Sequence, residues 1–340
     1  MPNKKIIVTG GAGFIGSHTV VELHNSGYTP IIIDNFSNSS ESVIEGIEKI
    51  IQTPVKYFKL DCNNKEQLEK LFSEEEDIIG VIHFAAYKAV GESVQQPLKY
   101  YSNNVGSTVA LLEVMQKYKV SNFVFSSSCT VYGEPDNLPV TEQSPIKPAQ
   151  SPYGNTKQIC EDVLKDFIKS GVSAKVISLR YFNPIGAHPT ALIGELPLGV
   201  PNNLIPFVTQ TAAGWREKIT VFGNDYDTTD GTCVRDYIHV VDLAKAHVKA
   251  LDLLSTANEN YYDVFNLGTG NGNTVLEVIK TFEEVNNLKL NYFIGPRREG
   301  DVEKVYASTE KANQKLKWKT ELSLAQGLKD AWNWQQKLKK

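Results

Sequence analysis

The feature that most constrains this chain is an apolar run that ends in a glycine-rich loop, from Ile6 to Gly16. Such a run predicts a buried strand, a tight turn and the start of a helix. Gly10, Gly13 and Gly16 stand three residues apart. This spacing allows a sharp turn, a close approach of the backbone to a pyrophosphate, and tight packing of the helix on the strand. The alternative interpretation is an ordinary strand–turn–helix connection.

A second predicted strand begins at Pro30 and ends in Asp34, 18 residues beyond Gly16. A carboxylate at this distance can accept hydrogen bonds from the ribose hydroxyls of a dinucleotide. Asp34 would also repel a 2′-phosphate, and no lysine or arginine follows it before Lys49, so the sequence favours NAD over NADP. Asp61, after the next apolar segment, is either a partner for the adenine side or a solvated acid at a strand end.

Strand-like and helix-like patterns alternate along the first half of the chain. The predicted strands are Ile6–Val8, Ile31–Ile33, Lys56–Leu60, Val81–Phe84, Phe123–Ser126 and Lys175–Leu179. Alternation of this kind is typical of a parallel sheet covered by helices on both faces. We therefore expect an α/β fold, a Rossmann-type doubly wound parallel sheet, with its ligands at the carboxyl ends of the strands.

Composition changes after Arg180, where proline and glycine recur as far as Pro206. This change predicts a first domain over residues 1–180 and a smaller α/β lobe over 181–340, with a segment near 236–255 packing back on the first domain. A final helix is predicted from Leu322 to Leu338, with Leu328 and Trp332 facing inward.

Charge and composition exclude several classes of partner. A net charge of −4 and a pI near 5.9 argue against nucleic acid and against an acidic membrane surface. No apolar run approaches the ~18 residues needed to cross a bilayer and no apolar leader is visible, so we expect a cytoplasmic protein without a membrane partner. The four cysteines form no CxxC pair and the six histidines no HExxH motif, so we expect no metal.

The most specific local pattern is the run from Ser151 to Lys157. Ser151 suits the N-cap of a helix and Pro152 its first position, so Tyr153 and Lys157 fall one turn apart on one face. A phenol with a pKa near ~10 is a poor base, but a nearby cation and NAD⁺ would stabilise the phenolate. Tyr153 could then take a proton from a sugar hydroxyl that Ser128 holds. Alternatively, the tyrosine and lysine merely line a helix.

Other candidates follow the predicted strand ends. Ala85 and Ala86 are small enough to admit a cofactor, while Lys88 is either a nearby cation or a solvated side chain. Asn103 and Asn104 could cap the following helix or contact a cofactor.

The second half offers groups suited to a nucleoside diphosphate. Residues Leu198–Leu204 and the predicted strand Ile219–Phe222 supply amides, backbone groups and an aromatic ring for a flat heterocycle. Arg235 and Arg298 suit a diphosphate, because planar guanidinium groups pair bidentately with its oxygens, and Asp301 could bind a ribose. Either arginine could instead form a structural ion pair.

Seven motifs lie along the chain: Thr9–Gly16, Ser126–Ser128, Tyr153–Lys157, Arg180–Pro184, Gly223–Tyr226, Val234–His239 and Arg297–Asp301. Together they resemble the UDP-glucose 4-epimerases of the extended short-chain dehydrogenase/reductase family, over about Ile6 to Trp334. The glycine loop and the Tyr–Lys pair are typical of the whole superfamily. The runs His83–Tyr101 and Asn224–His239 point to the epimerases.

The resemblance implies that the chain interconverts UDP-glucose and UDP-galactose, in galactose metabolism, with one tightly held NAD. Hydride would leave sugar C4 while Tyr153 removes the O4 proton, and the 4-keto sugar would turn over and take the hydride back on its other face. By the same resemblance, Ser128 would hold the O4 hydroxyl, and Lys157 would contact the nicotinamide ribose and lower the tyrosine's pKa.

Residue by residue, the motifs and the resemblance predict two sets of contacts. Those to NAD are Gly10, Gly13, Phe14, Ile15, Gly16, Asp34, Asn35, Asp61, Cys62, Phe84, Ala85, Ala86, Lys88, Asn103, Lys157 and Phe182. Those to the UDP-sugar, which would make residues 181–340 a UDP-sugar-binding domain, are Ser128, Tyr153, Asn183, Asn203, Leu204, Thr220, Val221, Phe222, Arg235, Arg298, Asp301 and Val305.

Two positions depart from many family members. Cys129 stands where alanine is usual, and we expect it to be tolerated. Val305 stands at the wall of the sugar pocket, where some members carry a tyrosine that blocks an N-acetyl group and others a small residue. Valine therefore predicts that UDP-N-acetylglucosamine and UDP-N-acetylgalactosamine are interconverted as well, unless another side chain closes the pocket.

Two rival functions share part of this pattern. A sugar-nucleotide dehydratase or decarboxylase would carry carboxylates beside the catalytic serine, where this chain has Cys129 and Thr130. A non-enzymatic NAD-binding sensor would have no need of Tyr153, Lys157 and Ser128 together. The family resemblance also implies a homodimer, whose paired helices would run about Val105–Tyr118 and Tyr153–Lys169.

Overall fold

A computed structural model describes residues 4–298 and 301–338 of this protein. Within these residues the largest element is a seven-stranded sheet in which every neighbouring pair is parallel. In spatial order its strands are β11 (Tyr261–Leu267), β6 (Lys175–Tyr181), β5 (Asn122–Ser128), β4 (Ile78–His83), β1 (Lys5–Thr9), β2 (Thr29–Asp34) and β3 (Lys56–Lys59). The strand order reverses between β1 and β4, as in a doubly wound sheet. The predicted α/β, Rossmann-type fold is confirmed.

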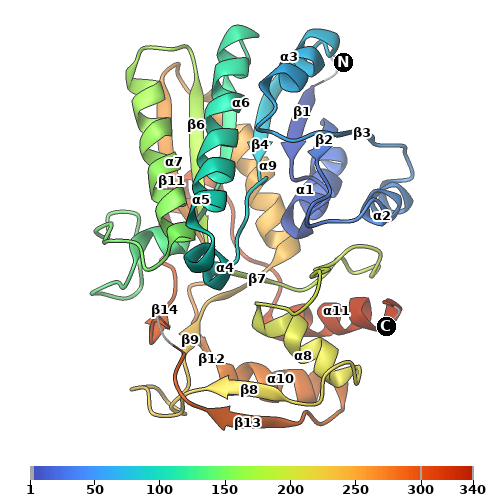
Figure 1. Ribbon diagram of the computed structural model, residues 1–340, viewed down its shortest axis with the longest axis vertical. Helices are drawn as coiled ribbons and strands as arrows, with labels where there is room; N and C mark the ends of the chain where they lie inside the picture. Colours follow the sequence, from blue (N-terminus) through green and yellow to red (C-terminus); the bar gives the residue numbers. More distant parts are fainter. Residues whose placement is uncertain (1–3, 299–300, 339–340) are drawn as a thin grey trace.

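Helices cover both faces of this sheet (Figure 1). One face carries α1 (Phe14–Asn25), α2 (Ser42–Ile51) and α9 (Val240–Thr256). The other carries α3 (Lys65–Glu74), α6 (Gly106–Lys117) and α7 (Pro152–Lys169). Because both faces are buried, the central strands such as β1 and β2 are apolar on both sides, which explains their continuous apolar runs in the sequence, whereas the edge strand β3 is mostly exposed.

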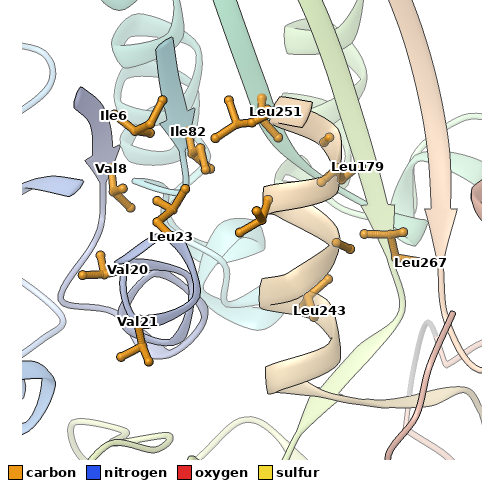
Figure 2. Close-up of a cluster of buried hydrophobic side chains, with 14 of the residues drawn as sticks. Ile6, Val8, Val20, Val21, Leu23, Ile82, Leu179, Leu243, Leu251 and Leu267 are labelled. Carbon is orange, nitrogen blue, oxygen red and sulfur yellow. The ribbon is translucent and has the colours of Figure 1, made fainter. Parts of the chain in front are cut away.

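The larger core cluster lies between the sheet and helices α1 and α9. Figure 2 shows Ile6, Val8 and Ile82 of the sheet facing side chains of both helices, such as Leu23 and Leu251. All five are fully or almost fully buried. Since α9 follows residue 239, the second half of the chain returns to complete this core.

A smaller lobe lies below the carboxyl edge of the sheet (Figure 1). Its parallel pair, β8 (Ile219–Phe222) with β13 (Tyr292–Gly295), packs with α8 (Leu204–Ala212), α10 (Val275–Asn286) and α11 (Leu324–Lys337) around a separate apolar cluster. Short strands join the two lobes: β7 (Asn183–Ile185), β9 (Val234–Arg235), β10 (Tyr237–His239), β12 (Asn273–Thr274) and β14 (Lys304–Val305).

The chain crosses between the lobes more than once. Strand β11 pairs with β6 over seven residues, and α9 contacts α1, although both elements come after residue 236. The proposed division at residue 180, with 236–255 packing back, therefore stays a prediction, to which the structure adds the contribution of β11 to the first sheet.

Of the two roles left open for Asn103 and Asn104, that of a helix cap is wrong. Both lie inside the π-helix η1 (Tyr101–Val105), which continues α5 (Pro97–Tyr100) directly into α6, and the cofactor contact of Asn103 stays a prediction. Other short elements are α4 (Val90–Gln95), the 3₁₀ turn η2 (Cys129–Tyr132) and the π-helix η3 (Ala312–Leu316). Glu299 and Gly300, part of one arginine motif, lie outside the described residues.

The final helix begins two residues later than predicted, at Leu324, because Ser323 caps it. Leu328 is fully buried and Trp332 packs edge-on against Phe282. Among residues 4–298 and 301–338, no helix has the length and apolar character that a membrane span requires.

Candidate active site

The glycine loop between β1 and α1 leaves a space, here called the glycine cradle, that side chains in place of the glycines would fill. Gly10 has φ of +68°, and a Cβ there would stand 2.9 Å from the backbone nitrogen of Ala85. A Cβ on Gly16 would collide with the carbonyl oxygen of Gly10. Gly13 is the N-cap of α1 and brings no capping side chain, so the N–H groups of the first turn, at Phe14 and Ile15, are left for an anion. The loop therefore fits a pyrophosphate.

Asp34, at the end of β2, ties the neighbouring loops together. One carboxylate oxygen accepts a hydrogen bond from the backbone of Ala12 (3.0 Å), and the other accepts from the backbone of Phe36 and the hydroxyl of Ser39 (both 2.9 Å). The side chain thus lies beside the glycine cradle, where the sequence predicts a ribose contact.

The predicted adenine side is a polar hollow past the end of β3. Asn35 donates to Asp61 (3.2 Å), and Asn63 donates to both Asp61 (3.0 Å) and Asn103 (3.1 Å). Burial raises the pKa of Asp61, but hydrogen bonds from Asn63 and Asn35 outweigh it and hold that pKa below its usual value. The hollow is lined by Asp61, Asn63, Asn64, Lys65 and Glu66. Cys62 is buried beside it.

The loop after β4 contacts elements of both lobes. The ring of Phe84 lies 4.7 Å from that of His247, and the backbone N–H of Ala85 faces the hydroxyl of Thr9 at 3.4 Å. Ala86 follows in the same loop. Lys88, expected to be a free or cofactor-facing cation, pairs with Glu195 across the lobes at 3.2 Å.

The Tyr–Lys helix forms as predicted. The hydroxyl of Ser151 accepts a hydrogen bond from the N–H of Gly154 (3.2 Å), and Pro152 occupies the first turn of α7. Tyr153 therefore lies in the first turn of the helix, where Ser128 at the end of β5 is close enough to lower the pKa of its phenol. The three residues predicted to carry the chemistry converge at the carboxyl edge of the sheet.

Burial controls the charge of both titratable groups here. The pKa of Lys157 falls to about 8 because its ammonium is almost fully buried, with its Nζ donating to the carbonyl of Ser126 (2.7 Å). Burial raises the pKa of Tyr153 to about 12, against the lowering effect of its hydrogen bond with Ser128. The Nζ of Lys157 lies 6.0 Å from the Tyr153 ring centre. The pKa of Tyr153 is therefore raised, whereas a nearby cation alone would lower it. Deprotonation of the phenol needs further positive charge.

An apolar cluster borders this centre. Val305 and Phe182 are buried in it together with Val131, and the partly buried Cys129 packs against them. Burial raises the pKa of the Cys129 thiol to about 11, so it behaves as a small apolar group at neutral pH. Val305 is in register with Arg235 in the β14–β9 pair, so this apolar cluster, the predicted apolar wall of the sugar site, lies next to the predicted diphosphate site.

Two predicted arginines share one carboxylate. Asp301 lies 2.6 Å from Arg298 and 3.6 Å from Arg235. Arg298 also lies over the ring of Phe222 at 5.8 Å, and both side chains are substantially exposed. The ion pairs that the sequence left open do form, and they gather two guanidinium groups and an aromatic ring at one surface. Thr220 and Val221 precede Phe222 in β8, and Val221 is buried, so only its backbone is available.

Glu195 belongs to the site, although nothing in the sequence marks it. Its carboxylate accepts from Asn203 (2.7 Å) as well as pairing with Lys88, so it joins a predicted UDP contact to a predicted NAD contact. Asn203 precedes Leu204, the first residue of α8. Glu195 lies in the irregular segment rich in proline and glycine, where no periodic pattern marks a buried face.

Asn183 lies at the start of β7, and its backbone N–H donates to Asp236 at 2.9 Å. All four cysteines are free thiols. Among the residues that the structure describes, no group of three or more histidine, cysteine or acidic side chains is arranged to hold a metal ion.

Comparisons with known proteins place the chain among the nucleotide-sugar enzymes. Residues 7–331 match a family model described as GDP-mannose 4,6 dehydratase. The chain is 50% identical to UDP-glucose 4-epimerase 2 of Arabidopsis thaliana, covering 97% of this chain and 95% of that protein. It is 49% identical to the UDP-glucose 4-epimerase of Bacillus subtilis, covering 97% and 96%.

A similar solved structure is that of UDP-glucose 4-epimerase from Bifidobacterium longum in complex with NAD⁺ and UDP. It is 48% identical, covers 98% of each chain and superposes with a TM-score of 0.94. The likeness extends through both lobes, including the segments that carry the predicted cofactor and nucleotide contacts.

Proposed function

The chain belongs to the UDP-glucose 4-epimerase family, and on that premise we propose that Tyr153, Lys157 and Ser128 carry out its reaction, the interconversion of UDP-glucose and UDP-galactose. The observation that carries this assignment is that Tyr153 and Lys157 in α7 and Ser128 at the end of β5 meet at the carboxyl edge of the sheet, the edge that also carries the glycine cradle. A phenol and a hydroxyl placed together can hold one sugar hydroxyl between them.

Each of these residues has a separate role in the reaction. The phenolate of Tyr153 takes the proton from the sugar O4 and becomes the phenol, and the hydroxyl of Ser128 orients that oxygen. NAD, when bound, supplies hydride acceptance and return at C4, and its charge adds to that of Lys157. Because burial raises the pKa of Tyr153 to about 12, this added positive charge is what makes the phenolate accessible near neutral pH.

The remaining predicted contacts position the two ligands. The glycine cradle and Asp34 fit the pyrophosphate and a ribose of NAD. Arg235 and Arg298 suit the diphosphate of the substrate, with Asp301 for its ribose and the exposed Phe222 ring for its base. Binding energy from this charged, non-reacting part of the substrate holds the uncharged sugar in place.

The two rival functions predict different behaviour. Elimination of water needs an acid or base beside the catalytic serine, but Cys129 and Thr130 occupy those positions and the thiol of Cys129 is protonated at neutral pH. A sensor would bind NAD without turnover. Purified protein incubated with UDP-galactose and no added NAD should give UDP-glucose. A dehydrated product would support the first rival, and no product even with NAD supplied would support the second.

A second activity is favoured by the size of Val305. It forms part of the apolar wall with Phe182 and Cys129, and a valine there leaves more space than a tyrosine would. We propose that UDP-N-acetylglucosamine and UDP-N-acetylgalactosamine are also interconverted.

We also propose a cytoplasmic homodimer. A hollow on the outer surface between α6 and α7 is lined mainly by apolar side chains, including Val109, Leu112, Val163 and Phe167. These are the two helices that the family resemblance pairs across a dimer. The free thiols of all four cysteines suit a reducing compartment. Sedimentation equilibrium would give twice the chain mass if the dimer forms.

A further inference from the structure

Helix α7 presents a third polar side chain on the face that carries the reacting tyrosine. Tyr153, Lys157 and Glu161 are spaced four residues apart, so they lie one above the other on that face. Each faces one member of the run Ser126–Ser128 in β5. Lys157 donates to the carbonyl of the first serine (2.7 Å), and the hydroxyl of the second donates to Glu161 (2.6 Å). The third serine lies close enough to Tyr153 to lower the pKa of its phenol.

Glu161 is also one half of a buried ion pair. Its two oxygens accept from the Nε (2.9 Å) and the Nη2 (2.5 Å) of Arg180, near the end of β6. The side chains are only 3% and 4% exposed. The two parallel hydrogen bonds fix both the distance and the orientation of the carboxylate.

Arg180 extends the contact to the rest of the site. Its Nη1 donates to the hydroxyl of Tyr132 (3.0 Å), which lies in the turn that follows Ser128. That hydroxyl donates in turn to Asn266 of β11 (2.6 Å). One chain of buried polar contacts therefore ties α7 to β5, β6, β11 and the turn η2.

We propose that Glu161 and Arg180 are a positioning pair, which holds the phenol of Tyr153 and the ammonium of Lys157 in register with the end of β5. This inference rests on the proposed function, because it assigns the pair a role in that reaction. A buried ion pair contributes little net stability compared with apolar side chains of the same size. We therefore attribute the position of the pair, one helical turn from Lys157, to its effect on the geometry and the charge of the reacting groups.

The charge of Glu161 has a defined effect on Lys157. Burial lowers the pKa of Lys157, and the negative charge of Glu161 opposes that lowering. The titratable groups around the Lys157 ammonium are Tyr153, Cys160 and Glu161 on its own helix and His83 on β4, with Arg180 behind Glu161. Without the Glu161 carboxylate, Lys157 would lose its proton at a lower pH.

Two variants test the two parts of the role. Ser127→Ala removes only the hydrogen bond between β5 and Glu161 and leaves the ion pair in place. We expect kcat for UDP-galactose to fall about tenfold, with KM and NAD content unchanged, because small misplacements of reacting groups have large effects on rate. Glu161→Gln keeps the volume and removes the charge. We expect it to move the alkaline limb of the kcat–pH profile to lower pH.

Asp330→Asn is the matched control, because Asp330 forms a comparably buried pair with His239, in α11 of the other lobe. We expect it to lower the unfolding temperature without moving the pH profile. If Ser127→Ala keeps the parent kcat, or if Glu161→Gln lowers stability and leaves the profile unchanged, the positioning role is wrong. Should Glu161→Gln fail to fold, the kcat of Ser127→Ala decides alone. Absence of turnover in the unmodified protein would instead reject the proposed function.

Discussion

The behaviour of Tyr153 depends on a balance between desolvation and charge. Its phenol lies where water is largely excluded, which raises the pKa to about 12, and Ser128 offsets part of that rise. The ammonium of Lys157 donates to a backbone carbonyl, and its Nζ lies 6.0 Å from the centre of the Tyr153 ring. A group in this position is protonated until substrate and cofactor are in place.

Tyr153→Phe removes the proton acceptor and leaves the glycine cradle intact. We expect kcat to fall by ~10²–10⁴-fold, the range typical of a general acid–base group, while NAD stays bound. Turnover of UDP-galactose and the absorbance of protein-bound nucleotide measure the two effects. Turnover within a few-fold of the parent would contradict the role assigned to Tyr153.

Val305→Tyr tests the apolar wall of the sugar site. Val305 is 8% exposed and packs with Phe182, so a tyrosine must extend away from that cluster, next to Arg235. We expect the variant to lose UDP-N-acetylgalactosamine turnover selectively and to keep UDP-galactose turnover, so that the ratio of kcat/KM for the two substrates changes by ~10–200-fold. The comparison is kcat/KM for the two substrates in parent and variant. An unmodified protein inactive on UDP-N-acetylgalactosamine would refute the idea at once.

At the scale of elements, the cap of α7 links folding to function. Ser151 satisfies the N–H of Gly154 in the first turn, which also contains Tyr153. We expect Ser151→Ala to lower the free energy of unfolding by about 1 kcal/mol, the usual effect of losing an N-cap, and to lower turnover because the first turn frays. Chemical denaturation and kcat provide the readouts.

Ser323→Ala is the matched control, since Ser323 caps α11 in the same way through Gln326. It should lower stability by a similar amount and leave kcat unchanged. Equal losses of turnover in the two variants would mean that the cap of α7 has no special connection with the site.

Local signals explain which elements were predictable. Five of the first six strands are predictable because each contains a short apolar run between helical patterns, and Ser151–Pro152 marks the start of α7. The exception is β3, a mostly exposed edge strand that begins and ends in lysine. Strand β11 was missed because Tyr261–Asp263 is only partly buried at the edge of the sheet, which interrupts the apolar run. The π-helix η1 has no sequence signature, so the sequence left a cap open as one of two roles for Asn103.

Long-range pairing explains what was missed at the site. Arg180 lies in a strand and Glu161 in a helix, and only the folded structure shows that they form one ion pair. Lys88 and Glu195 are separated by 107 residues, and their contact forms only when the lobes come together. Sequence patterns report the neighbours of a residue along the chain, whereas these pairs depend on the arrangement of whole elements.

At the scale of the molecule, the most pH-sensitive feature is a set of buried neutral histidines. Burial lowers the pKa of His18 and His83 to about 3 and that of His247 to about 4. In His18 and His247 the Nδ1 contacts a helix carbonyl, and the Nε2 has no hydrogen-bond partner among the described residues. Protonation would therefore bury an uncompensated charge beneath α1 and α9, in the core that joins the two halves of the chain.

This arrangement predicts that stability falls as the pH drops below about 6.5, the ordinary pKa of histidine. Between that value and the folded pKa of about 3 to 4, the unfolded chain binds more protons than the folded one, so each histidine lowers the unfolding free energy by up to ~1.4 kcal/mol per pH unit.

His247→Phe keeps a ring in place and removes one titrating group, so the stability of this variant should depend less steeply on pH. Denaturant titrations at pH 7.5 and 5.5, at a fixed saturating NAD concentration, compare it with the parent. His24→Gln, a partly exposed position in α1, is the control. An identical slope in His247→Phe and the parent would contradict the prediction.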